Sequence, residues 1–198
     1  MIKFNNLSQE KPYLLFKQRY EEAFNANQKN IEAISIASFN KDDNEVDSRF
    51  VNIKFIDKDR FIFFSNYNSP KSFAFKTHNQ ISGLFYWAST NVQIRMKANI
   101  EQTSLEYNQD YFKKRLSSKN ALAISSKQSE VISSYEAVLN NYDETFKKSN
   151  LTLCPEYWGG FSFVPYYFEF WEGHESRINK RLVFKKNDSN WEKFIIQP

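Results

Sequence analysis

The chain has 198 residues, a net charge of +4 from 27 basic and 23 acidic residues, and one cysteine, Cys154. The single cysteine excludes an intrachain disulfide, and the small charge excess does not indicate a nucleic-acid partner. The N-terminus lacks a secretory h-region and no apolar run could cross a bilayer, so we expect a cytoplasmic protein that does not attach to membranes.

The first third of the chain predicts a tail, two helices and three strands. Residues 1–11 are polar and predict a flexible tail. Aromatic residues then recur at helical spacing behind Pro12, which predicts a helix to Asn27. Ser69 and Pro70 predict the start of a short helix that ends near residue 79. Alternating apolar patterns predict strands over residues 33–40, 48–56 and 61–65, with turns at 41–47 and 57–60.

Helices and strands alternate through the rest of the chain. Ser104 predicts a helix start, as does the capping box formed by Ser133 and Glu136. Residues 117–129 are polar and predict an irregular segment. The two helices are predicted over residues 105–116 and 134–148. The strands are predicted over residues 81–87, 92–103, 160–164, 167–172, 182–186 and 191–196, the last two joined by a hairpin turn at 187–190.

Antiparallel hairpins with inserted helices predict an α+β fold built on a mainly antiparallel sheet or barrel. Aromatic residues make up 18% of the chain, which predicts a β-rich core and an extensive subunit interface. There is no internal repeat and no linker, so residues 1–198 are expected to form a single domain.

Several common kinds of active site are not supported. The chain has no GxGxxG, GxxxxGK[ST] or GxSxG motif. Two histidines, His78 and His174, and one cysteine are too few for a structural zinc site, and we expect no metal. Cys154 has no neighbouring histidine and is expected to be an inert thiol. A site built from basic and amide side chains remains.

Five segments place such side chains at strand ends or helix starts. They are RFVNIK (49–54), FFSNYNSPK (63–71), VQIR (92–95), KQS (127–129) and EFWEGHESRINKR (169–181). Basic and amide groups at these places suit a phosphate and a polar heteroaromatic ring. Each segment alone is typical of ordinary surface charge, but their combination indicates a binding site.

Together with YFKKR (111–115) and YWGGF (157–161), these segments resemble the pyridoxamine 5'-phosphate oxidase family, FMN-dependent oxidases of vitamin B6 metabolism. The resemblance runs from about Pro12 to Pro198, and the order and spacing of the segments make it specific. It implies a split β-barrel and a homodimer with two FMN sites at the dimer interface.

The resemblance also implies roles for individual residues. Arg49 and Lys71 would contact the FMN phosphate. The implied FMN contacts are Arg49, Phe50, Val51, Asn52, Ile53, Lys54, Phe64, Ser65, Lys71, Gln93, Gln128, Ser129, Trp171 and Arg181. The implied contacts to a phosphorylated pyridine substrate are Lys54, Tyr111, Arg115, Lys119, Arg177 and Asn179. Of these, Arg177 and Asn179 are the implied catalytic residues.

The implied reaction converts pyridoxamine or pyridoxine 5'-phosphate to pyridoxal 5'-phosphate. FMN carries the hydride chemistry, and O2 would reoxidise it with release of H2O2. Such a site needs a flat slot and a phosphate clamp rather than an acid–base pair. One difficulty is geometric: Arg49 and Lys54 would point to opposite faces of a flat strand, so both reach one cofactor only if the strand twists, bulges or ends.

Four features depart from the family pattern. Pro70 stands where the family has arginine, Lys119 where it has a substrate-binding serine, and Asn179 where it has histidine. We also expect the basic N-terminal arm to be missing, because the first helix is predicted to begin near Pro12, and its loss would leave a more open active site. Two alternatives to the oxidase therefore stay open: a related FMN enzyme acting on a different reduced ring compound, and a non-catalytic flavin-binding protein.

Overall fold

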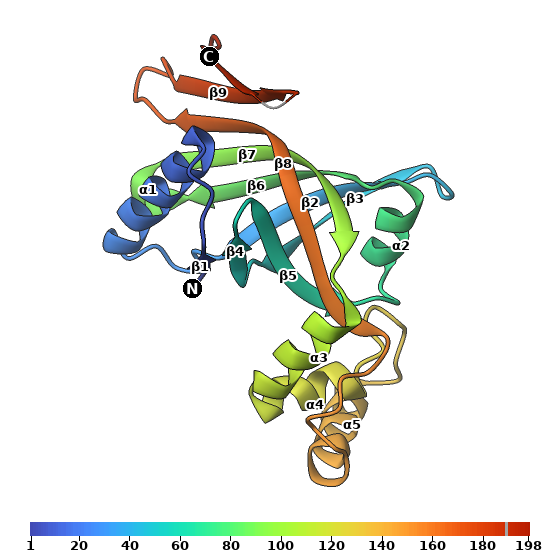
Figure 1. Ribbon diagram of the computed structural model, residues 1–198. Coiled ribbons are helices and arrows are strands. Elements are labelled where there is room, and N and C mark those ends of the chain that lie inside the picture. Colours follow the sequence, from blue (N-terminus) through green and yellow to red (C-terminus); the bar gives the residue numbers. More distant parts are fainter. Residues whose placement is uncertain (189) are drawn as a thin grey trace.

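The computed structural model describes residues 1–188 and 190–198 as an α+β fold around one large sheet (Figure 1). The helices are α1 (Lys11–Asn25), α2 (Pro70–Thr77), α3 (Leu105–Lys114), α4 (Ser117–Ser125) and α5 (Tyr135–Lys148), with a 3-10 turn η1 (Ala88–Thr90). The strands are β1 (Lys3–Asn5), β2 (Ala33–Asn40), β3 (Glu45–Asn52), β4 (Phe55–Asp57), β5 (Arg60–Asn66), β6 (Gln80–Trp87), β7 (Val92–Gln102), β8 (Trp158–Glu172), β9 (Lys180–Asn187) and β10 (Asn190–Ile195).

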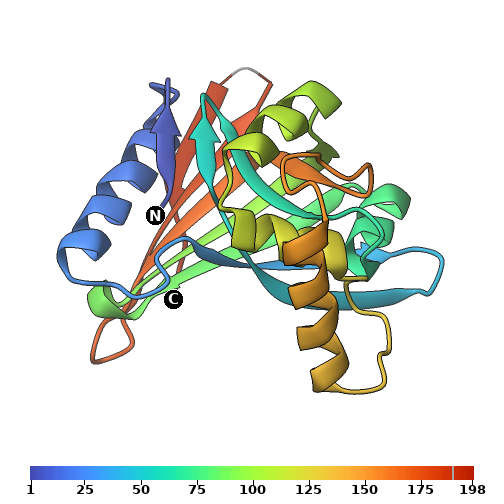
Figure 2. The ribbon, with the colours of Figure 1, turned by 90° about the horizontal axis from the view of Figure 1, so that it is seen from below.

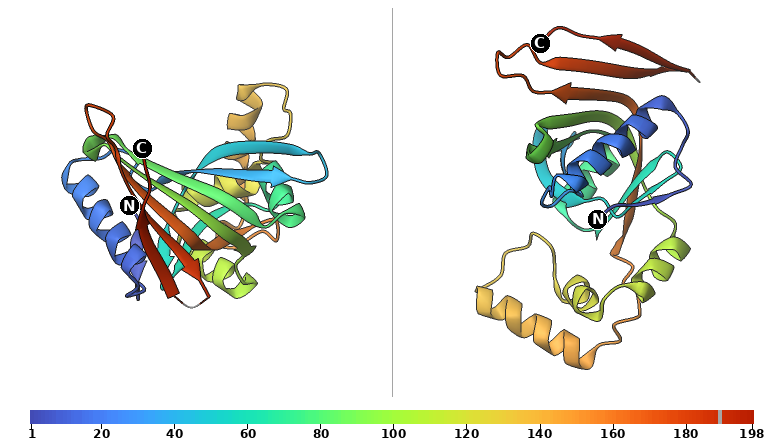
Figure 3. Two further views of the ribbon diagram at one scale, coloured as in Figure 1. Left: turned by 90° about the horizontal axis from the view of Figure 1, so that it is seen from above. Right: turned by 90° about the vertical axis from the view of Figure 1, so that its left-hand side faces the viewer.

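The strands follow the order β1-β4-β5-β8-β7-β6-β2-β3, and β9 with β10 extends the sheet from β8. Antiparallel pairing dominates, as predicted, but β1 runs parallel to β4, so the sheet is mixed. Figures 1 and 3 show α3, α4 and α5 gathered at one end of the molecule and the β9–β10 hairpin at the other. Ser189, in the predicted hairpin turn, lies outside the described residues.

Strand β8 organises the sheet because it pairs with β5, β7 and β9. The prediction of two separate strands on either side of Pro165 was wrong. The register against β7 shifts between Lys97 and Ala98: Lys97 faces Tyr167 and Ala98 faces Pro165. This bulge accommodates the proline, which has no N–H to donate, so one 15-residue strand continues through it.

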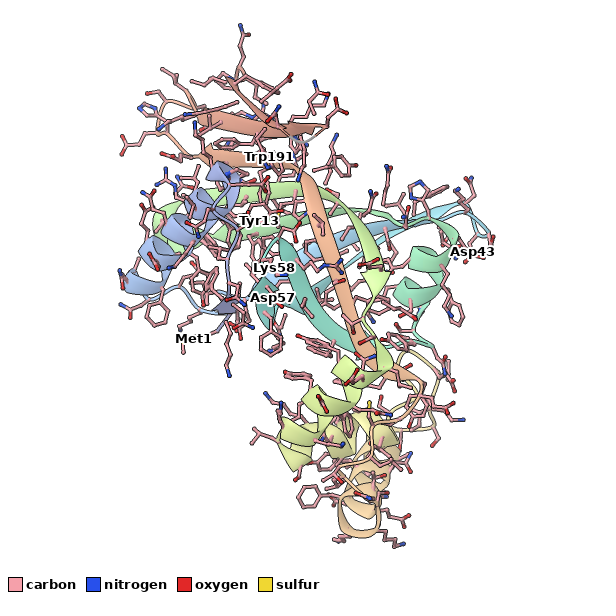
Figure 4. The ribbon with its side chains drawn as sticks, viewed as in Figure 1. Met1, Tyr13, Asp43, Asp57, Lys58 and Trp191 are labelled. Carbon is pink, nitrogen blue, oxygen red and sulfur yellow. The ribbon has the colours of Figure 1, made fainter. Side chains whose placement is uncertain are left out.

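The core is rich in aromatic side chains, as the composition predicted. Phe16 of α1 is fully buried and meets Phe61 and Phe85 edge-on, with ring centroids 5.1 and 5.4 Å apart. Tyr13, one turn earlier, packs against Trp191 of β10 (Figure 4). Truncating such a buried ring typically costs about 3–5 kcal/mol of stability, so α1 is held by its aromatic face.

The N-terminal residues do not form the predicted flexible tail. Lys3–Asn5 pairs in parallel with Phe55–Asp57, and the side chain of Ile2 is buried. The register places Asn5 opposite Asp57. The prediction failed because the free edge of β4 supplies hydrogen-bonding partners that the polar sequence does not reveal.

The strand predicted over residues 48–56 is interrupted. Strand β3 ends at Asn52, and Ile53 donates its backbone N–H to Glu32 O at 2.9 Å. Lys54 donates its N–H to Ile62 O at 2.8 Å before β4 begins. Lys54 therefore lies beyond the end of β3, and strand alternation no longer sends Arg49 and Lys54 to opposite faces.

Residues 117–125 form helix α4, although the sequence predicted an irregular segment. Asn120 is buried and donates to the carbonyl oxygens of Phe112 and Leu151, both at 2.8 Å. Ala121 is also buried, so tertiary contacts stabilise a helix that its polar residues do not favour. In the described part of the chain, no helix has the length and apolar character needed to span a membrane.

Candidate functional site

A cavity of about 640 Å³ lies among the end of β3, the start of α2 and helices α3 and α4. Figure 2 views the molecule from the end at which α3 and α4 lie. The residues that line this cavity are Lys3, Arg49, Phe50, Val51, Asn52, Lys54, Phe64, Ser65, Lys71, Tyr111, Lys114, Arg115, Leu116, Lys119, Leu122 and Gln128. The structure thus brings together most of the predicted site residues. Seven lining side chains are cationic and none is a carboxylate, so the cavity attracts anions.

Lys71 and Arg49 form the first cationic group in this cavity. The Lys71 side chain is only 5% exposed, and none of the ion pairs among the described residues includes it. Its Nζ donates to Ser69 Oγ at 2.8 Å. Burial, and then the charge of Arg49, lower the pKa of Lys71 to about 8. A buried ammonium group without a carboxylate partner is costly, and an anion bound beside it would offset that cost.

Ser69 supports Lys71 rather than capping helix α2 with its side chain. Its hydroxyl accepts the hydrogen bond from Lys71 and donates to Asn66 O at 2.7 Å. No side-chain cap bond is formed, which corrects the predicted cap, although Ser69 occupies the N-cap position and Pro70 begins the helix. The backbone N–H groups of this first turn add a favourable field for an anion next to Lys71.

Lys54, Arg115 and Lys119 form the second cationic group. The guanidinium of Arg115 lies 4.4 Å from the ring centroid of Trp158, and its Nη1 is buried without a hydrogen-bond partner. Burial lowers the pKa of Lys54, as do the nearby charges of Lys119 and Arg115, whereas Glu32 opposes that shift. The buried, unpartnered nitrogen of Arg115 is suited to an incoming phosphate.

An aromatic wall adjoins the second cationic group. Phe64 stacks on Tyr111 with ring centroids 3.9 Å apart, and on Trp158 at 5.2 Å with an interplanar angle of 11°. Burial raises the pKa of the Tyr111 hydroxyl, which keeps it a neutral hydrogen-bond donor. A flat ring could therefore lie along an apolar wall while its anionic substituent meets the cations.

A second cavity, of about 280 Å³, lies on the outer face of β6 to β9. It is lined by Leu84, Gln93, Arg95, Glu169, Trp171 and Arg181. The sheet register places Gln93 opposite Trp171, and Trp171 opposite Arg181. Three of the predicted cofactor contacts are therefore close to one another, but they line a different cavity from Arg49 and Lys71.

Glu169 organises this second cavity and was missed by the sequence reasoning. It is 4% exposed, is paired with Arg95 and with Arg181, and accepts a hydrogen bond from Tyr167 at 3.0 Å. Burial opposes its ionisation, but the hydrogen bonds from Arg181 and Arg95 hold the Glu169 pKa below its usual range. An acidic residue inside an aromatic strand was the available signal, since a buried carboxylate requires cationic partners.

The remaining predicted residues lie elsewhere. Arg177 and Asn179 are in the loop between β8 and β9, where Asn179 Oδ1 accepts a hydrogen bond from the His174 N–H at 3.1 Å. The Ile53 side chain is buried in the core. Ser129 lines a separate cavity near α4 and α5. Their roles toward a cofactor or substrate stay predictions.

Other lining residues were not predicted at all. Lys3 reaches the first cavity because β1 is paired rather than free, and Lys114 and Leu122 come from α3 and α4. Lys3 and Leu122 had no local motif, and Lys114 lies within YFKKR (111–115) but had no predicted role. No group of three or more His, Cys, Asp or Glu side chains suited to a metal ion occurs within residues 1–188 and 190–198.

Comparison with known proteins identifies close similarities. Residues 158–198 match the model of the pyridoxine 5'-phosphate oxidase C-terminal dimerisation region. The pyridoxine/pyridoxamine 5'-phosphate oxidase of Leptospira interrogans is 31% identical over 191 residues, which cover 94% of this chain and 88% of that protein.

Two solved structures share the fold. PhzG from Burkholderia lata 383, solved with tetrahydrophenazine-1-carboxylic acid, has a TM-score of 0.86 and 24% identity, covering 94% of this chain and 92% of that one. A pyridoxamine 5'-phosphate oxidase-related, FMN-binding protein from Nostoc punctiforme has a TM-score of 0.79 and 11% identity, covering 96% and 99%. These matches support the predicted split-barrel architecture.

Proposed function

Because the chain belongs to the pyridoxine/pyridoxamine 5'-phosphate oxidase family, we propose that it is an FMN-dependent oxidase that makes pyridoxal 5'-phosphate. Its substrates would be pyridoxamine 5'-phosphate or pyridoxine 5'-phosphate, with O2 consumed and H2O2 released. The family relationship supports an oxidoreductase, and the residues of the first cavity support a phosphorylated cofactor and a phosphorylated substrate.

The environment of the Lys71 side chain is the observation that supports the FMN assignment. Its ammonium group is buried, lacks a carboxylate partner among the described residues and lies beside Arg49 at the start of α2. A phosphate monoester placed there would supply the missing negative charge. Ser65 and Gln128, already joined by a hydrogen bond of 3.3 Å, would add polar contacts on the same side of the cavity.

The second cationic group would hold the phosphate of the substrate. Arg115 offers a buried nitrogen without a partner, and Lys54 offers an ammonium group nearby. Tyr111 would donate its hydroxyl hydrogen. Bound FMN would supply the hydride-accepting chemistry, so the chain itself has to position the substrate ring, neutralise its phosphate and exclude water.

We further propose that the working molecule is a homodimer in which the second copy completes each FMN site. Gln93, Trp171 and Arg181 lie together on the outer face of the sheet, away from the residues that line the first cavity. A second copy could bring that face to the cavity. The match of residues 158–198 to a dimerisation region supports this arrangement, because all but Gln93 lie in it.

A second candidate is a flavin enzyme that acts on a different reduced ring compound. Two observations favour it. Lys119 lines the cavity where the family is expected to have serine, and Asn179 is engaged in its own loop where the family is expected to have histidine. The fold is also shared with PhzG, which was solved with a tetrahydrophenazine carboxylic acid.

The decisive experiment has two parts. Purified protein is first titrated with FMN and followed by flavin fluorescence, and Arg181→Ala is compared with wild type. The loaded protein is then given pyridoxamine or pyridoxine 5'-phosphate, and peroxide is measured. We expect FMN binding that weakens in Arg181→Ala, and peroxide release with at least one substrate. Flavin binding without peroxide would reject the oxidase assignment, and no flavin binding would reject both parts.

A further inference from the structure

Asn108 of α3 is the centre of a buried hydrogen-bond network that does not line the first cavity. It is 2% exposed, and its Oδ1 accepts from Thr103 Oγ1 at 2.6 Å and from the Gly160 N–H at 2.8 Å. Its Nδ2 donates to the Tyr67 hydroxyl at 2.9 Å, and that hydroxyl donates to Gly160 O at 3.0 Å. One carboxamide therefore joins α3 to the start of β8 and to the turn before α2.

Two glycines of β8 leave the space that this network fills. A Cβ atom at Gly159 would collide with the Tyr67 hydroxyl and with Asn108 Nδ2. A Cβ atom at Gly160 would collide with Thr103 Oγ1. Neither glycine has a positive φ, so the chain needs the missing side chain here and not conformational freedom. Burial raises the pKa of Tyr67, so its hydroxyl stays protonated and the network keeps all its donors.

The network fixes α3 on the substrate side of the site. Asn108 and Phe112 are the buried residues of this helix, and Phe112 meets the Trp158 ring edge-on with ring centroids 5.0 Å apart. Tyr111 and Arg115 follow Asn108 by three and seven residues, so they project from the same side of α3. The Arg115 guanidinium lies over the ring of Trp158, in the same stretch of β8. The bonds from Asn108 to β8 therefore set where Tyr111 and Arg115 lie relative to that ring.

The turn before α2 depends less on Asn108. Tyr67 is also anchored by its own backbone N–H, which donates at 2.6 Å to a carbonyl oxygen of the segment before β8. Asn66 O accepts the hydroxyl of Ser69 at 2.7 Å, and Ser69 accepts from Lys71. Removal of the Asn108 side chain should therefore disturb α3 more than the turn that orients Lys71.

We infer that Asn108 is a positioning residue for the substrate, because it holds α3 so that Arg115, with Tyr111 beside it, meets the substrate phosphate. The inference rests on the proposed function, since it concerns how the substrate side of that same site is built. Asn108 does not line the cavity, so it acts through the side chains of α3. Its effect is on recognition of the phosphate group and not on retention of FMN.

Two probes that differ only by a phosphate measure this effect. They are 4-deoxypyridoxine 5'-phosphate and 4-deoxypyridoxine, which carry a methyl group at the reacting carbon and cannot be oxidised there as substrates. Binding of each to the FMN-loaded protein is measured by calorimetry. Wild type should prefer the phosphate ester about a hundredfold, as expected for charge-assisted hydrogen bonds. In Asn108→Ala this preference should fall about tenfold, while FMN affinity changes by less than about twofold.

A double-mutant cycle with Arg115→Ala shows whether Asn108 acts through Arg115. With Arg115 already replaced, the loss caused by Asn108→Ala should shrink from about tenfold to about twofold. Phe16→Leu is the control for stability, because it opens a cavity in the core under α1 and leaves α3 untouched. It should lower the thermal unfolding temperature without changing the phosphate preference.

Tyr67→Phe provides a second, milder variant. It removes one hydroxyl and leaves Asn108 its bonds to Thr103 and Gly160, so the phosphate preference should fall by only about threefold. This variant decides the question if Asn108→Ala does not fold. Full preference in Asn108→Ala, or in Tyr67→Phe where Asn108→Ala cannot be purified, would overturn the inference. A loss that persists undiminished in the Arg115→Ala background, or that Phe16→Leu reproduces, would overturn it as well.

The outcome for Asn108 can be separated from the outcome for the proposed function. Flavin binding and peroxide release with pyridoxine 5'-phosphate are recorded on the same wild-type preparation. If both occur and the variants keep their phosphate preference, the oxidase assignment stands and the positioning role is rejected. If wild type binds FMN but does not prefer the phosphorylated probe, the proposed substrate site and the role of Asn108 are both rejected.

Discussion

Arg181 donates a hydrogen bond from Nε to Oε1 of the buried Glu169 carboxylate at 2.8 Å, and its Nη2 forms an ion pair with the same oxygen at 2.7 Å. A further nitrogen of the same guanidinium donates to Gln197 O at 3.0 Å. The orientation of Arg181 is therefore set from two sides before any ligand arrives. Glu169 acts as a positioning residue for a side chain that is proposed to contact the flavin.

Glu169→Gln should weaken both the fold and flavin binding. The amide keeps the shape of the side chain but leaves Arg95 and Arg181 without their counter-charge. We expect the free energy of unfolding to fall by about 3 kcal/mol and FMN affinity to fall about tenfold. Thermal unfolding and FMN titration measure the two effects. Glu175→Gln in the exposed loop is the control, and unchanged FMN affinity in Glu169→Gln would contradict the positioning role.

Lys71→Met should change stability and flavin binding in opposite directions. Removing a buried ammonium group that has no carboxylate partner should leave the apo protein as stable or more stable, because a desolvated charge is lost. FMN affinity should fall about tenfold or more, since one charged hydrogen bond to the phosphate disappears. Lys76→Met, at an exposed lysine of the same helix, should change neither quantity much. A strong loss of apo stability in Lys71→Met would show that Lys71 has a structural role instead.

The Lys71 pKa of about 8 makes flavin binding depend on pH. A bound phosphate favours the charged ammonium, so FMN affinity should be highest below pH 8 and decline as the pH rises above it. Apo stability should change in the other direction. Between about pH 8 and 10.5 the unfolded chain holds this proton and the folded chain does not, so stability gains with rising pH. Lys71→Met should flatten both profiles, and an FMN affinity that does not change between pH 7 and 9.5 would reject the assignment.

Much of this arrangement could be predicted from local sequence. Aromatic residues at helical spacing behind Pro12 predicted α1, and basic residues near the end of β3 and at the start of α2 predicted side chains that the structure brings together in one cation-lined cavity. These signals are local, since they depend on residues within a few positions of one another. Helix α4 was missed because Asn120 is satisfied by carbonyl oxygens of Phe112 and Leu151, contacts that no short window of sequence contains.

The parts of the site that failed prediction depend on distant segments. Lys3 enters the cavity only because β1 finds the free edge of β4. Glu169 is understandable only with Arg95 and Arg181 from the neighbouring strands beside it. The sequence also did not predict that Arg181 and Lys71 line two different cavities of a single copy. Their relative positions exist only in the folded chain.

Asp47→Asn should strengthen flavin binding. Arg49 is paired with Asp47, which is 69% exposed, and this pairing competes with a phosphate for the guanidinium. Removing the charge of Asp47 leaves Arg49 held by Ser38 at 2.9 Å and free to meet the phosphate. Exposed ion pairs contribute about 0.2–1 kcal/mol, so FMN affinity should rise by up to about fivefold in a fluorescence titration. Asp42→Asn in the nearby turn is the control, and weaker binding in Asp47→Asn would mean that the pair orients Arg49 productively.

Asn179→His tests whether the loop between β8 and β9 suits pyridoxamine 5'-phosphate. Asn179 Oδ1 accepts a hydrogen bond from the His174 N–H, and an unprotonated imidazole nitrogen can accept the same bond, so the loop should keep its shape. An imidazole can also carry a proton and a positive charge near pH 7, which an amide cannot. If Asn179 limits the proposed oxidase, kcat/KM for pyridoxamine 5'-phosphate should rise several-fold in a peroxide assay. Asn140→His on the exposed surface of α5 is the control. A loss of activity in Asn179→His would instead indicate that this loop is adapted to a different ring substrate.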